Sequence, residues 1–127
     1  VTLSESSRQE AMEGEPVRRH VATLVPQYDK PVYSLFIANR IDVNTAETFR
    51  LGIWYTREDE RVDLHIIPLT LTQFSGFFKA IFAAGNVTPQ VLIDLMLKCG
   101  KHRSVCDAPQ WKVAIESEIK ATSVILT

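Results

Sequence analysis

Asp63 and His65 carry residue types from which a catalytic or metal site can be built. They lie two residues apart, so in an extended segment their side chains share one side. A carboxylate beside an imidazole can orient the ring or share a metal ion with it. The more ordinary interpretation, an exposed polar face on an edge strand, is the favoured one.

Cys99, His102 and Cys106 are clustered within eight residues and are the other possible metal ligands. Zinc prefers four ligands in paired spacings such as C-x2-C, and here there are three candidates and no such pair. A loop that ends a helix and contains one buried cysteine is therefore the favoured interpretation.

Two basic strings have the chemistry to contact phosphate. Arg18, Arg19 and His20 are consecutive. Successive arginines on a helix cannot both be buried, so at least one points outward, where its forked donors match a phosphate. His20 borders an apolar helix face, and a solvated face with a boundary histidine is the ordinary interpretation. A second patch, for which ordinary surface charge is favoured, comprises Lys98, Lys101, His102 and Arg103.

Composition limits the class of protein. The 127 residues, 46% hydrophobic and 23% charged, suffice for one domain with a core. The formal net charge of −1 is not that of a strongly basic nucleic-acid binder, so DNA contacts would come from local patches. Two cysteines favour a reducing, cytoplasmic location. No stretch approaches about 18 apolar residues, which predicts no membrane span. Glycine-rich phosphate loops and GxSxG elbows are absent from the sequence.

The first half of the chain alternates strand and helix patterns. Residues 1–3 resemble the end of a strand, and Ser7 with Glu10 predicts a helix start by a capping box. That helix reaches Leu24, but residues 14–16 (Gly-Glu-Pro) predict a kink, or a second helix over 15–24. Further elements are a covered strand over 31–38 and a helix from Asn44 or Thr45 through Trp54.

The second half begins with a strand and becomes helical. Alternation over 62–66 predicts a half-buried strand that Pro68 closes. Thr70 with Gln73 caps a helix rich in phenylalanine that ends at Gly85. Further helices are expected over 89–100 and from Asp107, with a short strand over 123–126. The fold class is α/β: a mixed sheet flanked by helices, with residues 1–127 as a single domain.

Three stretches of the sequence together resemble a known family of enzymes. The first joins VTLSESSRQ (1–9) to EPVRRHV (15–21), the second is PVYSLFIA (31–38), and the third joins NTAETFR (44–50) to IIPLTLTQF (66–74). Over about residues 1–84 the chain resembles the cleavage domain of the AlwI/MlyI/PleI group of type IIS restriction endonucleases and related nicking enzymes.

The resemblance implies a nuclease of the PD-(D/E)xK type, related to the FokI cleavage domain. Such enzymes hydrolyse the phosphodiester bonds of double-stranded DNA, using Mg²⁺ bound by acidic residues to activate water. The chain would be the C-terminal portion of that domain: an incomplete restriction-endonuclease-like mixed sheet with C-terminal helices. Cleavage domains of this kind often pair, so a homodimer or heterodimer is expected.

The sequence departs from the complete family motif at its start. A metal-binding glutamate would fall immediately before Val1, and Thr2 stands where the motif usually carries lysine. We therefore expect a fragment that binds no metal by itself and does not cut DNA alone. Within it, the resemblance points to Gln9 and His20 as local contributors to catalysis. The expected DNA-binding residues are Arg8, Arg18 and Arg19.

Two other functions are consistent with the sequence. An alternative is a non-catalytic interaction or dimerisation module, because the phenylalanine stripe is wide for one small sheet to cover. That stripe consists of Phe74, Phe77, Phe78 and Phe82. The chain could also bind DNA by itself, in which case neutralising Arg18 and Arg19 would weaken binding and flatten its salt dependence.

Overall fold

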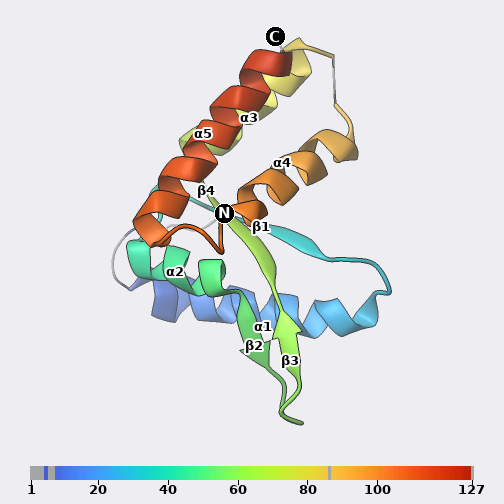
Figure 1. Cartoon of the computed structure of the whole chain (residues 1–127), viewed down its shortest axis with the longest axis vertical. Coiled ribbons are helices and arrows are strands. Elements are labelled where there is room, and N and C mark those ends of the chain that lie inside the picture. The colour runs from blue at the N-terminus through green and yellow to red at the C-terminus, as the bar shows by residue number, and fades with distance from the viewer. Residues whose placement is uncertain (1–4, 6–7, 86, 127) are drawn as a thin grey trace.

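The computed structural model describes residues 5, 8–85 and 87–126 of the chain (Figure 1). The strand expected over residues 1–3 and the capping role of Ser7 lie outside the described residues. Helices and two pairs of strands make up the described part, so the mixed α/β class is confirmed. No helix in the described ranges has the length and apolar character needed to cross a bilayer.

The N-terminal helical run is continuous through the glycine–proline string. A π-helical turn, η1 (Glu10–Gly14), leads into α1 (Glu15–Leu24) and the 3-10 turn η2 (Val25–Gln27). The helix predicted over 15–24 is therefore α1. In place of the expected break, the Glu15 N–H donates to the Glu10 carbonyl five residues back, in the wide turn of a π-helix. Pro16 then stands in the first turn of α1, where its missing N–H is tolerated.

Two strand pairs share one long extended segment. β1 (Tyr33–Ala38) pairs in parallel with β4 (His65–Thr70), with Tyr33 opposite His65 and Ala38 opposite Thr70. β2 (Ile53–Tyr55) pairs antiparallel with β3 (Arg61–Asp63). Only Leu64 separates β3 from β4, and its N–H donates to the Gly52 carbonyl at 2.7 Å. The run from β3 to β4 therefore links the hairpin to the parallel pair (Figure 1).

The helix expected to reach Trp54 is shorter than predicted. α2 spans Val43–Leu51, and Gly52 ends it in the left-handed conformation with φ of 60°. A β-carbon at Gly52 would lie 2.6 Å from the Leu64 carbonyl oxygen, so this close approach requires glycine. The next residues, Ile53 to Tyr55, are β-branched or aromatic and form β2 instead.

Pro68 does not close its strand, contrary to the prediction from sequence. It is buried inside β4, opposite Phe36 of β1. Within the described residues β4 has a sheet neighbour on one side only, and an edge position tolerates a proline because one row of N–H groups is not needed for pairing.

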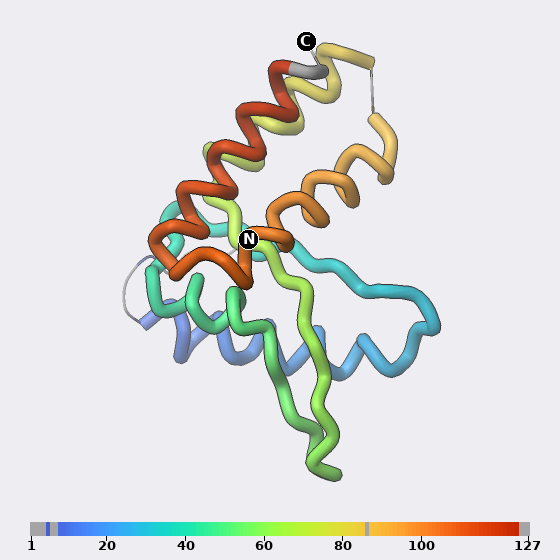
Figure 2. Tube along the Cα trace, viewed as in Figure 1, coloured from blue at the N-terminus to red at the C-terminus, as the bar shows by residue number. Residues whose placement is uncertain are grey.

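Three helices complete the chain: α3 (Leu71–Ala83), α4 (Pro89–Lys101) and α5 (Ala108–Leu126). The capping box of Thr70 and Gln73 at the start of α3 is confirmed, and Gly85 follows that helix with φ of 69°. The terminal strand expected over 123–126 is wrong, because α5 continues to Leu126 and packs along α2, α3 and α4 (Figure 2). The Ser123 hydroxyl donates to the Ile119 carbonyl, which keeps this serine compatible with helix.

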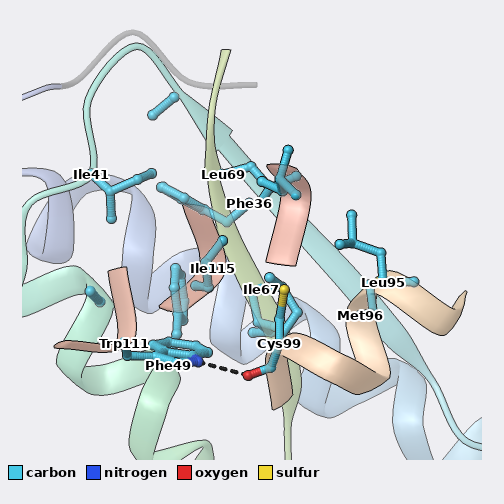
Figure 3. Packing of buried hydrophobic residues seen from close by; sticks show 14 of the residues in the cluster. Phe36, Ile41, Phe49, Ile67, Leu69, Leu95, Met96, Cys99, Trp111 and Ile115 are labelled. Carbon is cyan, nitrogen blue, oxygen red and sulfur yellow. Dashed lines mark hydrogen bonds between the residues drawn. The ribbon is translucent and has the colours of Figure 1, made fainter. Parts of the chain in front are cut away.

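The core lies where the parallel strands meet α2, α4 and α5. Trp111 and Phe49 are fully buried there, beside Ile67 and Cys99 (Figure 3). The Trp111 indole N–H donates to the Cys99 carbonyl at 2.9 Å, which satisfies the polar atom of the largest core side chain. This bond fixes the start of α5 against the end of α4.

Candidate functional site

Gln9 is buried and holds the loop that follows β1. Its Nε2 donates to the Arg40 carbonyl at 2.7 Å, and its Oε1 accepts the Asp42 N–H at 2.9 Å. Asp42 in turn caps α2 through its carboxylate. The amide of Gln9 therefore fixes both the carboxyl end of β1 and the start of α2. The catalytic role expected for Gln9 stays a prediction.

His20 lies on the exposed surface of α1. It is eleven residues beyond Gln9 along one continuous helical run, a separation of about 16 Å at 1.5 Å per residue. One side chain is buried and the other is exposed. The structure therefore does not bring the two predicted catalytic residues together.

Arg18 belongs to an internal cluster beneath α1 and not to the outer surface. Its guanidinium pairs with Glu10 and lies over the Trp54 ring, 5.6 Å from the centroid. The second Glu10 oxygen accepts a hydrogen bond from the Thr48 hydroxyl at 2.9 Å. The Glu10–Arg18 cluster, comprising these four residues, joins η1 and α1 to α2 and β2.

Arg19 and Arg8 are the outward members of the predicted DNA-binding set. The Arg19 side chain is 64% exposed, with its Nε 3.8 Å from Glu15, a loose surface pair that leaves it accessible to a phosphate. Arg8 is exposed at the start of the described helical run. Successive arginines 18 and 19 are thus divided between interior and surface, as the helical pattern required.

Asp63 and His65 line a pocket that gathers basic side chains from three parts of the chain. We call it the arginine pocket; its volume is about 440 Å³. Its charged and polar lining residues are Arg50, Arg61, Asp63, His65, Arg103 and Ser104. Arg50 and Arg61 were not identified from sequence, because each lies alone in its own segment and only the tertiary fold brings them to Arg103.

Hydrogen bonds fix Arg103 at the base of this pocket. Its Nη1 donates to the Leu64 carbonyl at 2.8 Å, and its Nη2 lies 3.4 Å from His65 Nδ1. Arg50 Nη1 donates to the Arg103 carbonyl at 2.9 Å. Burial lowers the pKa of the Arg103 guanidinium. Burial, with the charge of Arg103 as a smaller cause, also lowers the pKa of His65.

Cys99, His102 and Cys106 do not form a metal site. Cys99 is buried, and burial raises the pKa of its thiol to about 12. His102 Nε2 lies 3.0 Å from Glu118. Among the residues that the structure describes, no three His, Cys, Asp or Glu side chains are grouped closely enough to hold a metal ion.

The phenylalanine stripe on α3 is divided between the core and the surface. Phe77 is buried, whereas Phe82 is 63% exposed. Phe78 lies between Phe74 and Phe82 with tilted rings, whose centroids are 4.6 and 6.2 Å away. These rings line a hollow of about 560 Å³ together with Leu71 and Lys79. We call this surface the phenylalanine face. Exposed apolar area of this kind is typical of protein interfaces.

Comparisons with known proteins identify relatives of the chain. The model of the AlwI restriction endonuclease family matches residues 1–77. The chain is also similar in structure to the small subunit (R.BspD6I2) of the heterodimeric restriction endonuclease R.BspD6I, with a TM-score of 0.72 and 27% sequence identity. This similarity covers 91% of our chain and 59% of the subunit, so the chain spans about three-fifths of that protein's length. A search of curated proteins finds no match.

These two comparisons agree with the restriction-endonuclease-like fold expected from sequence. The family match over residues 1–77 includes the helical run that contains Gln9 and continues through the parallel strands into α3. It covers more than half of the 127 residues. The chain therefore belongs to the AlwI restriction endonuclease family.

Proposed function

We propose that the whole protein is a type IIS restriction endonuclease that hydrolyses phosphodiester bonds of double-stranded DNA, and that this chain supplies the C-terminal portion of its cleavage domain. The observation that carries the proposal is the family match over residues 1–77. The likeness to a restriction endonuclease subunit, at 27% identity over 91% of the chain, supports it.

The part played by this chain is to position the catalytic strands and the DNA. Gln9 holds the loop after β1 through two backbone hydrogen bonds, and the Glu10–Arg18 cluster fixes the helix on α2 and β2. Of the predicted DNA contacts, Arg8 and Arg19 are exposed and fit a phosphate contact, whereas Arg18 fits a structural part. The exposed imidazole of His20 fits an orienting part at the DNA surface.

Mg²⁺ is the cofactor proposed for the complete enzyme, where it would activate the attacking water. The described residues do not offer three grouped ligands for it. We therefore derive no step through the metal.

The test is divalent-metal-dependent cleavage of DNA. The whole protein encoded by the gene, incubated with long DNA of known sequence and with supercoiled plasmid, should give discrete fragments or nicked circles only when Mg²⁺ or Mn²⁺ is present. The 127-residue chain alone should leave both substrates intact. A folded whole protein that neither cuts nor nicks with either metal would contradict the proposal.

Pairing with a second nuclease subunit is the function that the phenylalanine face favours. R.BspD6I is heterodimeric, and the similar chain is its small subunit. Three adjacent rings on one face of α3, with Phe82 exposed and Phe74 and Phe78 partly buried, provide the aromatic contact area that is enriched in interfaces.

Sedimentation velocity at micromolar concentration tests this pairing. Phe82→Lys should shift the protein toward monomer, whereas Val113→Lys, at a similarly exposed position on α5, should leave the assembly unchanged. A wild-type protein that is strictly monomeric at these concentrations would rule out a homodimer formed through this face.

A further inference from the structure

The arginine pocket brings together cations that are distant in sequence. Arg50 comes from α2, Arg61 from β3, and Arg103 from the connection between α4 and α5. Three guanidinium groups therefore line one concave surface of about 440 Å³. None of the three belongs to the set of DNA contacts expected from the family resemblance.

The charge of the pocket differs from that of the chain as a whole. Three arginines and one aspartate line it, which leaves an excess of two positive charges (3 − 1) when His65 is neutral. Glu47 pairs with Arg50 and offsets part of that excess. The whole chain carries −1. A concave cationic surface on a weakly acidic protein concentrates the field on a small anion.

The base of the pocket is built before any ligand arrives. Arg103 is held by the Leu64 carbonyl, by His65 and through its own carbonyl by Arg50. Gly52 leaves room for it, because a β-carbon there would lie 2.5 Å from Arg103 Nη1. A side chain fixed in this way loses little further conformational freedom on binding, which favours affinity.

The rim of the pocket is exposed to solvent by contrast. The Arg61 side chain is 57% exposed and pairs at 3.0 Å with Asp63, which is 63% exposed. Such a pair contributes little to stability and exchanges readily for another partner. An arriving anion would therefore gain Arg61 and displace Asp63, while Arg103 stays in place.

We propose that the arginine pocket binds a backbone phosphate of the DNA that this enzyme cuts. This inference rests on the proposed nuclease function. Each guanidinium has five N–H donors, and the hydrogen bonds described for Arg50, Arg61 and Arg103 leave donors on each for phosphate oxygens. Forked donors match phosphate, and contacts of this kind fix the register of a protein on duplex DNA without reading its sequence.

Fluorescence anisotropy with a short labelled duplex at several salt concentrations tests the pocket in the 127-residue chain. Arg61→Gln should weaken binding by about three- to tenfold for any sequence and lower the salt slope by about one. Asp63→Asn should strengthen binding, by about two- to fivefold, because it removes the competing carboxylate. Arg57→Gln removes the same charge from an exposed site outside the pocket and is the matched control.

Inorganic phosphate distinguishes a DNA contact from a site for the free ion. Added phosphate should shift the NMR signals of His65 and compete with DNA only at concentrations far above that of the duplex. Identical DNA affinities for wild type, Arg61→Gln and Asp63→Asn would overturn the proposal, as would equal losses in Arg61→Gln and Arg57→Gln. A chain that binds phosphate but no duplex at low salt would also overturn the proposal. The nuclease proposal is tested separately, by measuring cleavage by the whole protein.

Discussion

The Glu10–Arg18 cluster and the arginine pocket both gather arginine side chains around α2, but their surroundings give them different parts. In the cluster, one arginine meets one glutamate, and the pair is covered by Trp54 and Thr48. In the pocket, three arginines and Asp63 line an open volume, and Glu47 pairs with Arg50, which leaves an excess of one positive charge. The balance of charge, more than the number of arginines, indicates which site is structural and which one is available to a ligand.

Gly52→Ala should have the largest effect, because it disturbs the pocket at its base. The left-handed backbone and the approach of the Leu64 carbonyl and Arg103 leave no room for a methyl group. We expect a loss of roughly 2–5 kcal/mol in the free energy of unfolding, measured by urea denaturation. Gly76→Ala, where a β-carbon meets nothing within 4 Å on α3, is the control and should stabilise the protein slightly. Equal stability of Gly52→Ala and wild type would contradict the described geometry.

Gln9→Leu should have the next largest effect. It tests the helical run next to the Glu10–Arg18 cluster. The change leaves the Arg40 carbonyl and the Asp42 N–H without their partner beneath a buried side chain. A loss of about 2–3 kcal/mol is expected by chemical denaturation. Gln27→Leu, at an exposed glutamine, should change stability little. If Gln9→Leu abolishes cleavage by the whole enzyme with no loss of stability, Gln9 acts in catalysis and not as a positioning residue.

Replacing one arginine in each of the two sites tests the comparison directly. Arg18→Met should lower the free energy of unfolding by about 1–2 kcal/mol, since it leaves Glu10 without its ion pair in a half-covered site. It should leave DNA affinity unchanged. Arg61→Gln should change stability by less than about 0.5 kcal/mol, because its ion pair is exposed. Thermal denaturation and anisotropy on the same samples would show the opposite pattern if the two assignments were reversed.

A pH titration of stability should give the smallest effect. Burial and the neighbouring Arg103 lower the pKa of His65 in the folded chain below its ordinary value of 6.5. The unfolded chain therefore takes up the proton first, and the stability provided by neutral His65, present above pH 6.5, falls as the pH falls through the lowered folded value. His65→Asn should flatten this slope, whereas the exposed His20→Gln should leave it. An unchanged slope in His65→Asn would show that other groups cause it.

Much of the fold followed from local patterns, and the failures have physical causes. Capping residues located α3 and α5, because hydrogen bonds at a helix start are satisfied within a few residues. Pro89 located α4, because proline fits the first turn of a helix. The expected continuation of α2 to Trp54 failed because the left-handed turn at Gly52 was not recognised as a helix end. Pro68 was taken as a strand end, whereas its place at an edge of the described sheet makes it compatible with β4.

The candidate site was harder to predict than the fold. The split of Arg18 and Arg19 between interior and surface followed from helical geometry. Asp63 and His65 line the same pocket, as their spacing predicted, but Asp63 ends β3 and His65 begins β4. The convergence of Arg50, Arg61 and Arg103 was not predicted, because it depends on how α2, the β2–β3 hairpin and the α4–α5 connection pack together. Local sequence patterns do not predict that packing.

The extended run from Arg61 to Thr70 fixes the distance between two surfaces of the chain. It begins at the arginine pocket and ends where α3 and its phenylalanine face begin. Nine steps of extended backbone span about 30 Å, and pairing with β2 and β1 fixes their course. The run therefore sets the separation of the two surfaces to which we assign a DNA phosphate and a partner subunit as proposals. Inserting a single residue into this run would turn the following side chains to the opposite face of the sheet. The run therefore tolerates insertions and deletions less well than a loop does.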